Sequence, residues 1–234
     1  MTTVDQILAE LESLGVEEDR AGMERYGINT QRAFGIRIPV LRKMAKVIGT
    51  DHELAQELWD SEMHEARILA SMIDDPARVS EEQMEAWVKD FNSWDLCDQV
   101  CGNLFDKTAL AYEKAVEWAG REEEFVKRAG FAIMAWAAFH VKDAPDEVFE
   151  KYFPIIVREA TDERNFVKKA VSWALRNIGK RNLALNGAAV DTAKEIKGIE
   201  DKTAKWIAND ALRELTSEKV QERLRKKESK PGNR

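Results

Sequence analysis

The sequence is poor in the residues that build disulfide frameworks and metal centres. It holds two cysteines and three histidines in 234 residues. Cys97 and Cys101 stand four apart in one predicted helix, which is a poor geometry for a disulfide, and we assign both to the core. The scattered histidines show no metal-ligand spacing. We therefore expect reduced thiols and no metal site.

Several segments that would mark another class of protein are also missing. No run of about 18 apolar residues occurs, so no membrane span is expected. The first residues, MTTVDQILAELESLG, carry acids and no basic stretch, which argues against a secretory signal. The motifs GxxxxGK[ST], GxGxxG, HExxH and GxSxG are all absent. These absences predict a soluble, cytoplasmic protein without the commonest phosphate-binding and hydrolytic motifs.

The net charge of −7 hides two basic segments. Residues 25–46 hold six basic residues, among them Arg42 and Lys43, and no acid. Residues 165–181 hold five and again no acid. Two acid-free basic stretches in an acidic chain are consistent with an electrostatic footprint for a polyanion such as DNA. Two solvated helix faces are the alternative interpretation.

Almost every segment has the pattern of a helix, and none alternates convincingly with period two. Thr3 with Gln6, and Ser80 with Gln83, have the spacing of a capping box. Pro39 suits the first turn of a helix that ends near Ile48. The chain is therefore predicted to be all-α. Further helices are expected near 63–74, 81–90, 94–105, 107–119, 122–139, 146–159, 163–179, 182–196, 200–213 and 217–227.

A weak internal repeat orders these helices. The pentapeptide Phe-Val-Lys-Arg-Ala at 125–129 returns as Phe-Val-Lys-Lys-Ala at 166–170. A period near 40 residues with two helices per unit is typical of HEAT-type arrays, which stack into curved solenoids with a concave binding face. Ordinary helical packing with a chance echo is the alternative. We expect one solenoid domain over 1–228 and a disordered basic tail at 229–234.

Two aspartates and a tryptophan lie together at the start of the helix predicted over 94–105. Asp95 and Asp98 are three apart and share a face opposite the apolar stripe that contains the two cysteines. Asp95 suits the positive end of the helix dipole, whereas Asp98 needs another reason. A solvated acid pair is the structural alternative to a functional one.

Trp173 falls off the apolar stripe of its helix, which we expect to be Val167, Ala170, Val171, Ala174 and Ile178. It shares a face with Lys169, Arg176 and Lys180 instead. An indole among cations suits stacking or cation–π contact with a ligand. Burial against a neighbouring repeat is the alternative.

Arg128 lies in the first turn of its helix, where the dipole disfavours cations, and this placement points to an anionic partner such as phosphate. An internal salt bridge is equally compatible with it. Tyr26 directly precedes Gly27 and the first basic stretch. This tyrosine either packs in the fold or contacts a ligand.

Taken in order, these features resemble the AlkD-type DNA alkylation-repair glycosylases, whose HEAT-like solenoid cradles duplex DNA in a basic concave groove. The resemblance covers roughly residues 5–225. One departure is Ser93, which stands where the best-known members carry a second tryptophan. The residues that carry the resemblance are Arg25, Tyr26, Gly35, Ile36, Pro39, Arg42, Ser93, Trp94, Asp95, Asp98, Arg128, Phe166, Lys169, Ala170, Trp173, Leu175 and Arg176.

The resemblance implies a monofunctional DNA N-glycosylase that excises cationic N3- and N7-alkylated purines from double-stranded DNA. It makes Asp98 the catalytic carboxylate, with Trp94 and Trp173 as indoles at the lesion. It implies no metal or organic cofactor, and we expect a monomer. A non-catalytic protein for damaged or branched DNA, and a solenoid for an acidic protein partner, are the alternatives. The DNA-binding residues expected are Tyr26, Arg128, Lys168, Lys169, Arg176, Lys180, Arg42 and Lys43.

Overall fold

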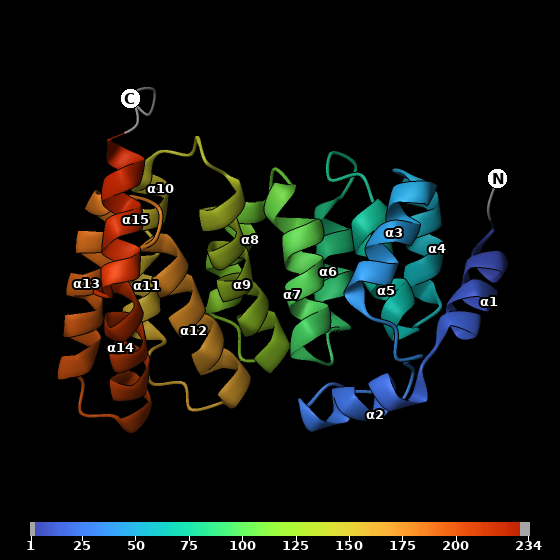
Figure 1. Cartoon of the computed structure of the whole chain (residues 1–234), viewed down its shortest axis with the longest axis horizontal. Helices are drawn as coiled ribbons and strands as arrows, with labels where there is room; N and C mark the ends of the chain where they lie inside the picture. Colours follow the sequence, from blue (N-terminus) through green and yellow to red (C-terminus); the bar gives the residue numbers. More distant parts are fainter. Residues whose placement is uncertain (1–2, 230–234) are drawn as a thin grey trace. The chain divides into compact units, whose positions relative to one another are not determined.

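The computed structural model describes residues 3–229, and that range contains helices and no strand (Figure 1). The prediction of an all-α protein is confirmed. The chain forms two compact units, Met1–Leu110 and Ala111–Arg234. The expectation of a single domain over 1–228 stays a prediction, and residues 230–234 of the predicted tail lie outside the described range. None of the helices within 3–229 is long and apolar enough to cross a bilayer.

The first unit is built around α5, in which every residue except Met72 is buried. Helices α3, α4 and α7 pack against α5. Because α5 is covered on all sides, its polar residues must find partners inside the unit. The helices of this unit are α1 (Val4–Leu14), α2 (Glu17–Arg25), α3 (Ile38–Ile48), α4 (His52–Asp60), α5 (His64–Ile73), α6 (Glu81–Lys89), α7 (Trp94–Asn103) and the 3-10 helix η1 (Phe105–Lys107).

The predicted helix starts in this unit are mostly confirmed. Thr3 and Gln6 form a complete capping box before α1, with bonds of 3.4 and 3.0 Å. Ser80 caps α6 by accepting from the backbone of Gln83 at 3.2 Å. The Gln83 side chain does not complete that box, because its amide donates to Asp74 at 2.6 Å.

Helix α2 is not among the helices predicted from the sequence, and it has no buried residue. Its sequence, EEDRAGMER, offers no apolar stripe to detect. Polar bonds hold it in place instead. Arg37 donates two hydrogen bonds to Asp19 at 2.7 and 2.8 Å, and the Thr30 hydroxyl donates to Glu24 at 2.6 Å.

The second unit is built around α9, which packs against α8 and α12. Gly130 lets α8 come close, because a Cβ atom at this position would lie 2.5 Å from the backbone nitrogen of Ala119. Helix α12 in turn packs against α14. The helices of this unit are α8 (Ala111–Ala119), α9 (Glu124–His140), α10 (Asp146–Glu150), α11 (Phe153–Arg158), α12 (Asn165–Ile178), α13 (Leu183–Gly198), α14 (Lys202–Leu215) and α15 (Glu218–Glu228).

The repeated pentapeptide marks equivalent places on adjacent helices. The rings of Phe125 and Phe166 are 5.7 Å apart, and Arg128 Nη1 donates to the Phe166 carbonyl at 2.5 Å. The sequence echo is therefore matched by a direct contact between α9 and α12, which run side by side in Figure 1. This contact favours the repeat interpretation over a chance echo.

The single helix predicted over 146–159 is wrong. The chain forms two short helices there, α10 and α11, separated by Lys151 and Tyr152. Pro154 falls in the first turn of α11, where its missing N–H costs nothing. The same proline inside one continuous helix would have removed a hydrogen bond.

Candidate nucleic-acid interface

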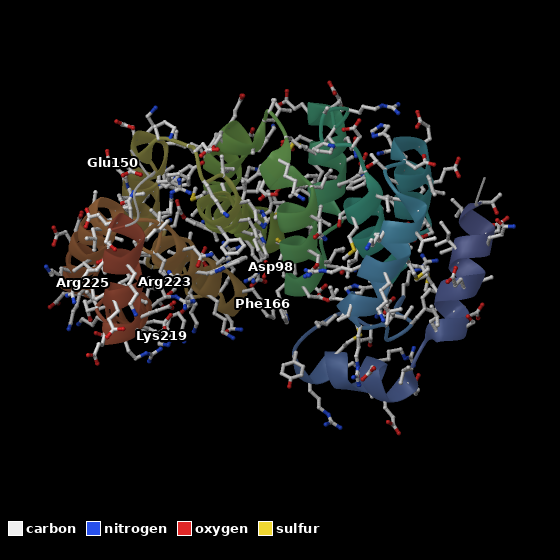
Figure 2. All side chains as sticks on the ribbon, turned by 45° about the horizontal axis from the view of Figure 1, so that its top comes forward. Asp98, Glu150, Phe166, Lys219, Arg223 and Arg225 are labelled. Carbon is white, nitrogen blue, oxygen red and sulfur yellow. The ribbon has the colours of Figure 1, made fainter. Side chains whose placement is uncertain are left out.

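Helix α7 carries the aspartate and tryptophan that the sequence singles out. Cys97, Val100, Cys101 and Leu104 are buried as the predicted stripe requires, and neither cysteine is in a disulfide. Leu96 and Gly102 are buried as well. Burial raises the pKa of Cys101, as do the neighbouring Cys97 and the charge of Asp98. Asp98 is half-buried on α7 (Figure 2). It follows Trp94 by four residues, which is about one helical turn. Trp94 and Asp98 therefore share one face of α7.

Trp94 is joined to Tyr26, another predicted site residue, within the first unit. Its indole Nε1 donates to the backbone carbonyl of Tyr26 at 2.9 Å. Tyr26 follows the last turn of α2, and 73% of its surface is exposed. The structure thus joins Trp94 to Tyr26 by a direct hydrogen bond. The Tyr26 ring itself stays at the surface.

Asp95 is not a solvated acid. Its Oδ2 lies 2.9 Å from Nε2 of His64, and its Oδ1 accepts from the Ser93 hydroxyl at 2.8 Å. Burial alone would raise the pKa of Asp95, but His64 and Ser93 outweigh it and lower the pKa. For His64, burial opposes the charged ring, while the bond to Asp95 raises its pKa above the ordinary 6.5. The N-terminal turn of α7 is therefore tied to α5 by a buried acid–histidine pair.

His64 is not among the site residues predicted from the sequence. A usable signal existed in the spacing of the helices. His64 and Asp95 are 31 residues apart, and so are Trp59 and Asp90, whose indole and carboxylate bond at 2.9 Å. Polar residues separated by the distance in sequence between successive helices are expected to face one another.

The cations of the first basic stretch divide into two groups. Arg32 is ion-paired with Glu62, and Arg37 with Asp19. By contrast, Arg42 and Lys43 on α3 are exposed, and their side chains make no hydrogen bond or ion pair within residues 3–229. The two predicted DNA-binding residues of α3 therefore keep their full charge for a partner.

Trp173 lies off the buried stripe of α12, as predicted, and all five stripe residues are buried. Trp173 itself is half-buried, and its ring meets Trp136 edge-on at 5.5 Å. His140 stacks on Trp136 at 5.0 Å, and Phe139 beside it is 64% exposed. Trp173 therefore borders an aromatic cluster of α9.

The remaining predicted contacts of this unit have different surroundings. Arg128 is buried, and its bond to the Phe166 carbonyl gives it a structural role at the α9–α12 contact. Lys168 lies over the Trp206 ring at 5.5 Å and lines a pocket that also contains Lys202. Lys169 is exposed and has no ion pair among the described residues.

The acid-free segment 165–181 is compensated in part, because α14 supplies acids to two of its cations. Arg176 pairs with Asp210 and Glu214, and Lys180 pairs with Glu214 at 2.7 Å. The DNA-binding roles of Arg176 and Lys180 stay predictions.

Arg181, counted in the same footprint, is buried. Its guanidinium donates to four backbone carbonyls at 2.9 to 3.2 Å and lies 3.9 Å from the Phe149 ring centre. Burial lowers its pKa, against the opposing charge of Asp146. This arginine is therefore structural.

No set of three or more histidine, cysteine, aspartate or glutamate side chains that could hold a metal ion occurs within 3–229.

The chain matches the family described as DNA alkylation repair enzyme over residues 7–215. No curated protein matches it. Among solved structures it is similar to one from a family of proteins related to the HEAT-like repeat DNA glycosylases with affinity for branched DNA structures. That similarity has 22% identity and a TM-score of 0.76, and it covers 92% of this chain and 96% of the other. It supports the HEAT-like fold.

Two further similarities are weaker. An engineered protein shares 15% identity with a TM-score of 0.39, over 92% of this chain and 99% of the other. A designed armadillo repeat protein in complex with peptide (KR)4 shares 15% identity with a TM-score of 0.34, over 79% of this chain and 88% of the other. Neither bears on the fold.

Proposed function

Because the chain belongs to the DNA alkylation repair enzyme family, we propose that it is a DNA N-glycosylase for positively charged N3- and N7-alkylated purines in duplex DNA. The observation that supports this most directly is the face of α7. Trp94 and Asp98 share that face, and the Trp94 indole is bonded to the carbonyl of Tyr26. We propose that this aromatic face, this carboxylate and the exposed Tyr26 contact one nucleotide.

The chemistry suits this residue set. A purine alkylated at N3 or N7 is cationic, so it leaves with the electron pair of the glycosidic bond and becomes neutral. The sugar then develops oxocarbenium character, which the Asp98 carboxylate stabilises by its charge. Water adds to C1′ and loses a proton, and Asp98 orients that water. The products are the free base, an abasic site and one proton.

The aromatic residues supply selectivity in this proposal. An indole face attracts a cationic base or sugar more strongly than a neutral one. Trp94 has this role in the first unit, and Trp173 is proposed as a DNA contact in the second. Arg128, whose Nη1 donates to the Phe166 carbonyl, remains a proposed phosphate contact. Lys168, Lys169, Arg176 and Lys180 are proposed to contact the DNA backbone.

A second candidate is a non-catalytic protein that binds damaged or branched DNA. The observation that favours it is Ser93, which replaces a tryptophan of the best-known members. Ser93 is buried and donates to Asp95, so this position offers no second indole. The similar solved structure, from a family with affinity for branched DNA, is compatible with this candidate.

The deciding experiment measures release of free 7-methylguanine and 3-methyladenine from methylated duplex DNA by mass spectrometry. Asp98→Asn is expected to keep DNA affinity and to lose turnover by on the order of 100-fold or more. Asp60→Asn is the matched control, because it removes the same charge from an exposed residue of the same unit.

Four outcomes separate the candidate functions. Release by wild type and Asp60→Asn, with loss in Asp98→Asn, supports the glycosylase. Equal release by Asp98→Asn would show that the role of Asp98 is wrong. DNA binding without release from any variant would favour the non-catalytic candidate. Weak, salt-insensitive DNA binding would instead favour an acidic protein partner, because phosphate contacts release counterions.

A further inference from the structure

A small polar pocket of about 70 Å³ lies in the first unit next to the Tyr26 and Trp94 segments. Asn29, three residues after Tyr26, and Asn92, two residues before Trp94, both line it. His64 and Arg67 of α5 line it as well. The Trp94–Tyr26 bond therefore joins the same two segments that contribute to this pocket.

Two buried side chains of the pocket have unused nitrogens. His64 is 5% exposed, and its Nε2 faces Asp95, but its Nδ1 has no partner among residues 3–229. Arg67 is 9% exposed, and it donates through Nε to the Trp59 carbonyl and through Nη2 to Asp90. Its Nη1 has no partner within the described chain. Neither nitrogen is sealed from solvent. Both nitrogens can therefore donate to an occupant of the pocket.

The charges around His64 favour its imidazolium form. Asp95 on α7 and Glu65 on α5 raise its pKa, against burial and the charge of Arg67. The pocket wall adds one more cation and one more anion, Arg32 and Glu62, which are paired with each other. With Nε2–H directed to Asp95, the protonated ring presents Nδ1–H as a donor. Arg67 Nη1 is a donor in any state.

The occupant must therefore be a compact hydrogen-bond acceptor. Arginine and imidazolium donors bind phosphate oxygens through charge-assisted bonds, and the side-chain amides of Asn29 and Asn92 add further donors. The volume suits one small group and is far below that of a drug-sized ligand site. We propose that this pocket binds one backbone phosphate of the DNA strand that Trp94 contacts, an assignment that rests on the proposed function.

Such a phosphate would also act on the helix that carries Asp98. A bond from Nδ1–H of His64 polarises the ring, and the opposite nitrogen holds Asp95 in the first turn of α7. His64 is thus both a phosphate ligand and a positioning residue. DNA bound at the pocket would fix the turn from which Trp94 projects.

The test compares His64→Gln with His52→Gln in duplex DNA binding near pH 6. The glutamine amide can take the place of Nε2 beside Asp95 but has no counterpart to Nδ1. His52 is the matched control, because it also pairs with an aspartate, Asp74 at 2.6 Å, and does not line the pocket. His64→Gln should weaken binding about tenfold. It should also make the negative slope of log K against log salt less steep by about 0.9. His52→Gln should change neither the affinity nor the slope.

A second measurement observes the ring directly. In protein labelled with ¹⁵N-histidine, the Nδ1 resonance of His64 should shift on addition of duplex DNA, whereas that of His52 should not. Wild-type binding with His64→Gln unchanged in affinity and slope would overturn the pocket assignment and leave the proposed function intact. Absence of DNA binding by wild type would overturn both. A shift with inorganic phosphate but not with DNA would assign the pocket to free phosphate and also overturn the proposal.

Discussion

The indole Nε1–H of Trp94 donates to the backbone carbonyl of Tyr26 over 2.9 Å, across 68 positions of sequence. The acceptor is a main-chain atom, so the bond fixes the place of the segment and not the identity of its side chain. The edge of the Trp94 indole therefore holds the segment that follows α2, and mutations can separate this role from the ligand contact proposed for its face.

Trp94→Phe keeps an aromatic face and removes the donor. We expect a loss of about 1 kcal/mol in unfolding free energy and faster amide hydrogen exchange in residues 26–30. Tyr26→Phe is the control, because it leaves the accepting carbonyl in place and should keep wild-type exchange. Equal exchange in Trp94→Phe and wild type would show that the bond does not hold this segment.

The His64–Asp95 pair predicts how stability depends on pH. The pKa of His64 is raised, so its contribution is complete below about pH 6 and is lost as the pH rises through the folded value. The pKa of Asp95 is lowered, so its contribution is present above its ordinary value of 3.8 and is lost as the pH falls through the folded value. Urea unfolding of wild type and His64→Gln at a series of pH values checks this. The fall in stability on the alkaline side should be smaller in His64→Gln, and identical profiles would contradict it.

Gly130 and Gly187 form a matched pair for packing. A Cβ atom at Gly130 would lie 2.5 Å from Ala119 N and 2.9 Å from Ala115 O, whereas one at Gly187 meets nothing within 4 Å. Gly130→Ala should therefore destabilise the chain by about 1 to 3 kcal/mol. Gly187→Ala, in the middle of α13, should stabilise it by roughly 0.5 to 1 kcal/mol. Thermal unfolding measures both, and a stabilised Gly130→Ala would mean that α8 can move away from α9.

The exposed cations Arg42 and Lys43 of α3 should contribute more to DNA affinity than Arg37, which is already paired with Asp19. Arg42→Gln and Lys43→Gln each remove one charge. Each should make the negative slope of log K against log salt less steep by about 0.9. Arg37→Gln removes the same charge, but Asp19 already compensates it, so its effect on the slope should be smaller. Fluorescence anisotropy with duplex DNA at several salt concentrations distinguishes them. If Arg42→Gln and Lys43→Gln kept the wild-type slope, α3 would not be part of the DNA interface.

Much of the fold followed from local sequence, because most helices carry apolar stripes and start signals. The stripe of α12 and the box at Thr3 are examples. Helix α2 could not be found in this way, since polar bonds and not apolar burial hold it. The break before α11 was missed because the pattern of apolar residues continues across Tyr152 and Phe153, both of which are buried.

The sequence singles out residues for the candidate site, but it does not show the partners that hold them. The alternative of a solvated Asp95 stayed open in the sequence because His64, its partner, lies 31 residues upstream on another helix. Arg176 looked uncompensated because its acids come from α14, about one repeat downstream. Local composition does not show partners at that distance, whereas the repeat spacing predicts where to look for them.

The burial of Arg181 has a consequence for the order in which the chain folds during synthesis. The carbonyls of Ala138, Val141, Lys142 and Ala144 lie at the end of α9 and in the connection to α10, and the Arg181 guanidinium bonds all four. A ribosome releases residue 181 well after this connection has emerged. The carbonyls at the end of α9 therefore stay solvated until Arg181, which follows α12, has been synthesised. The connection between α9 and α10 is completed by residues that are translated later.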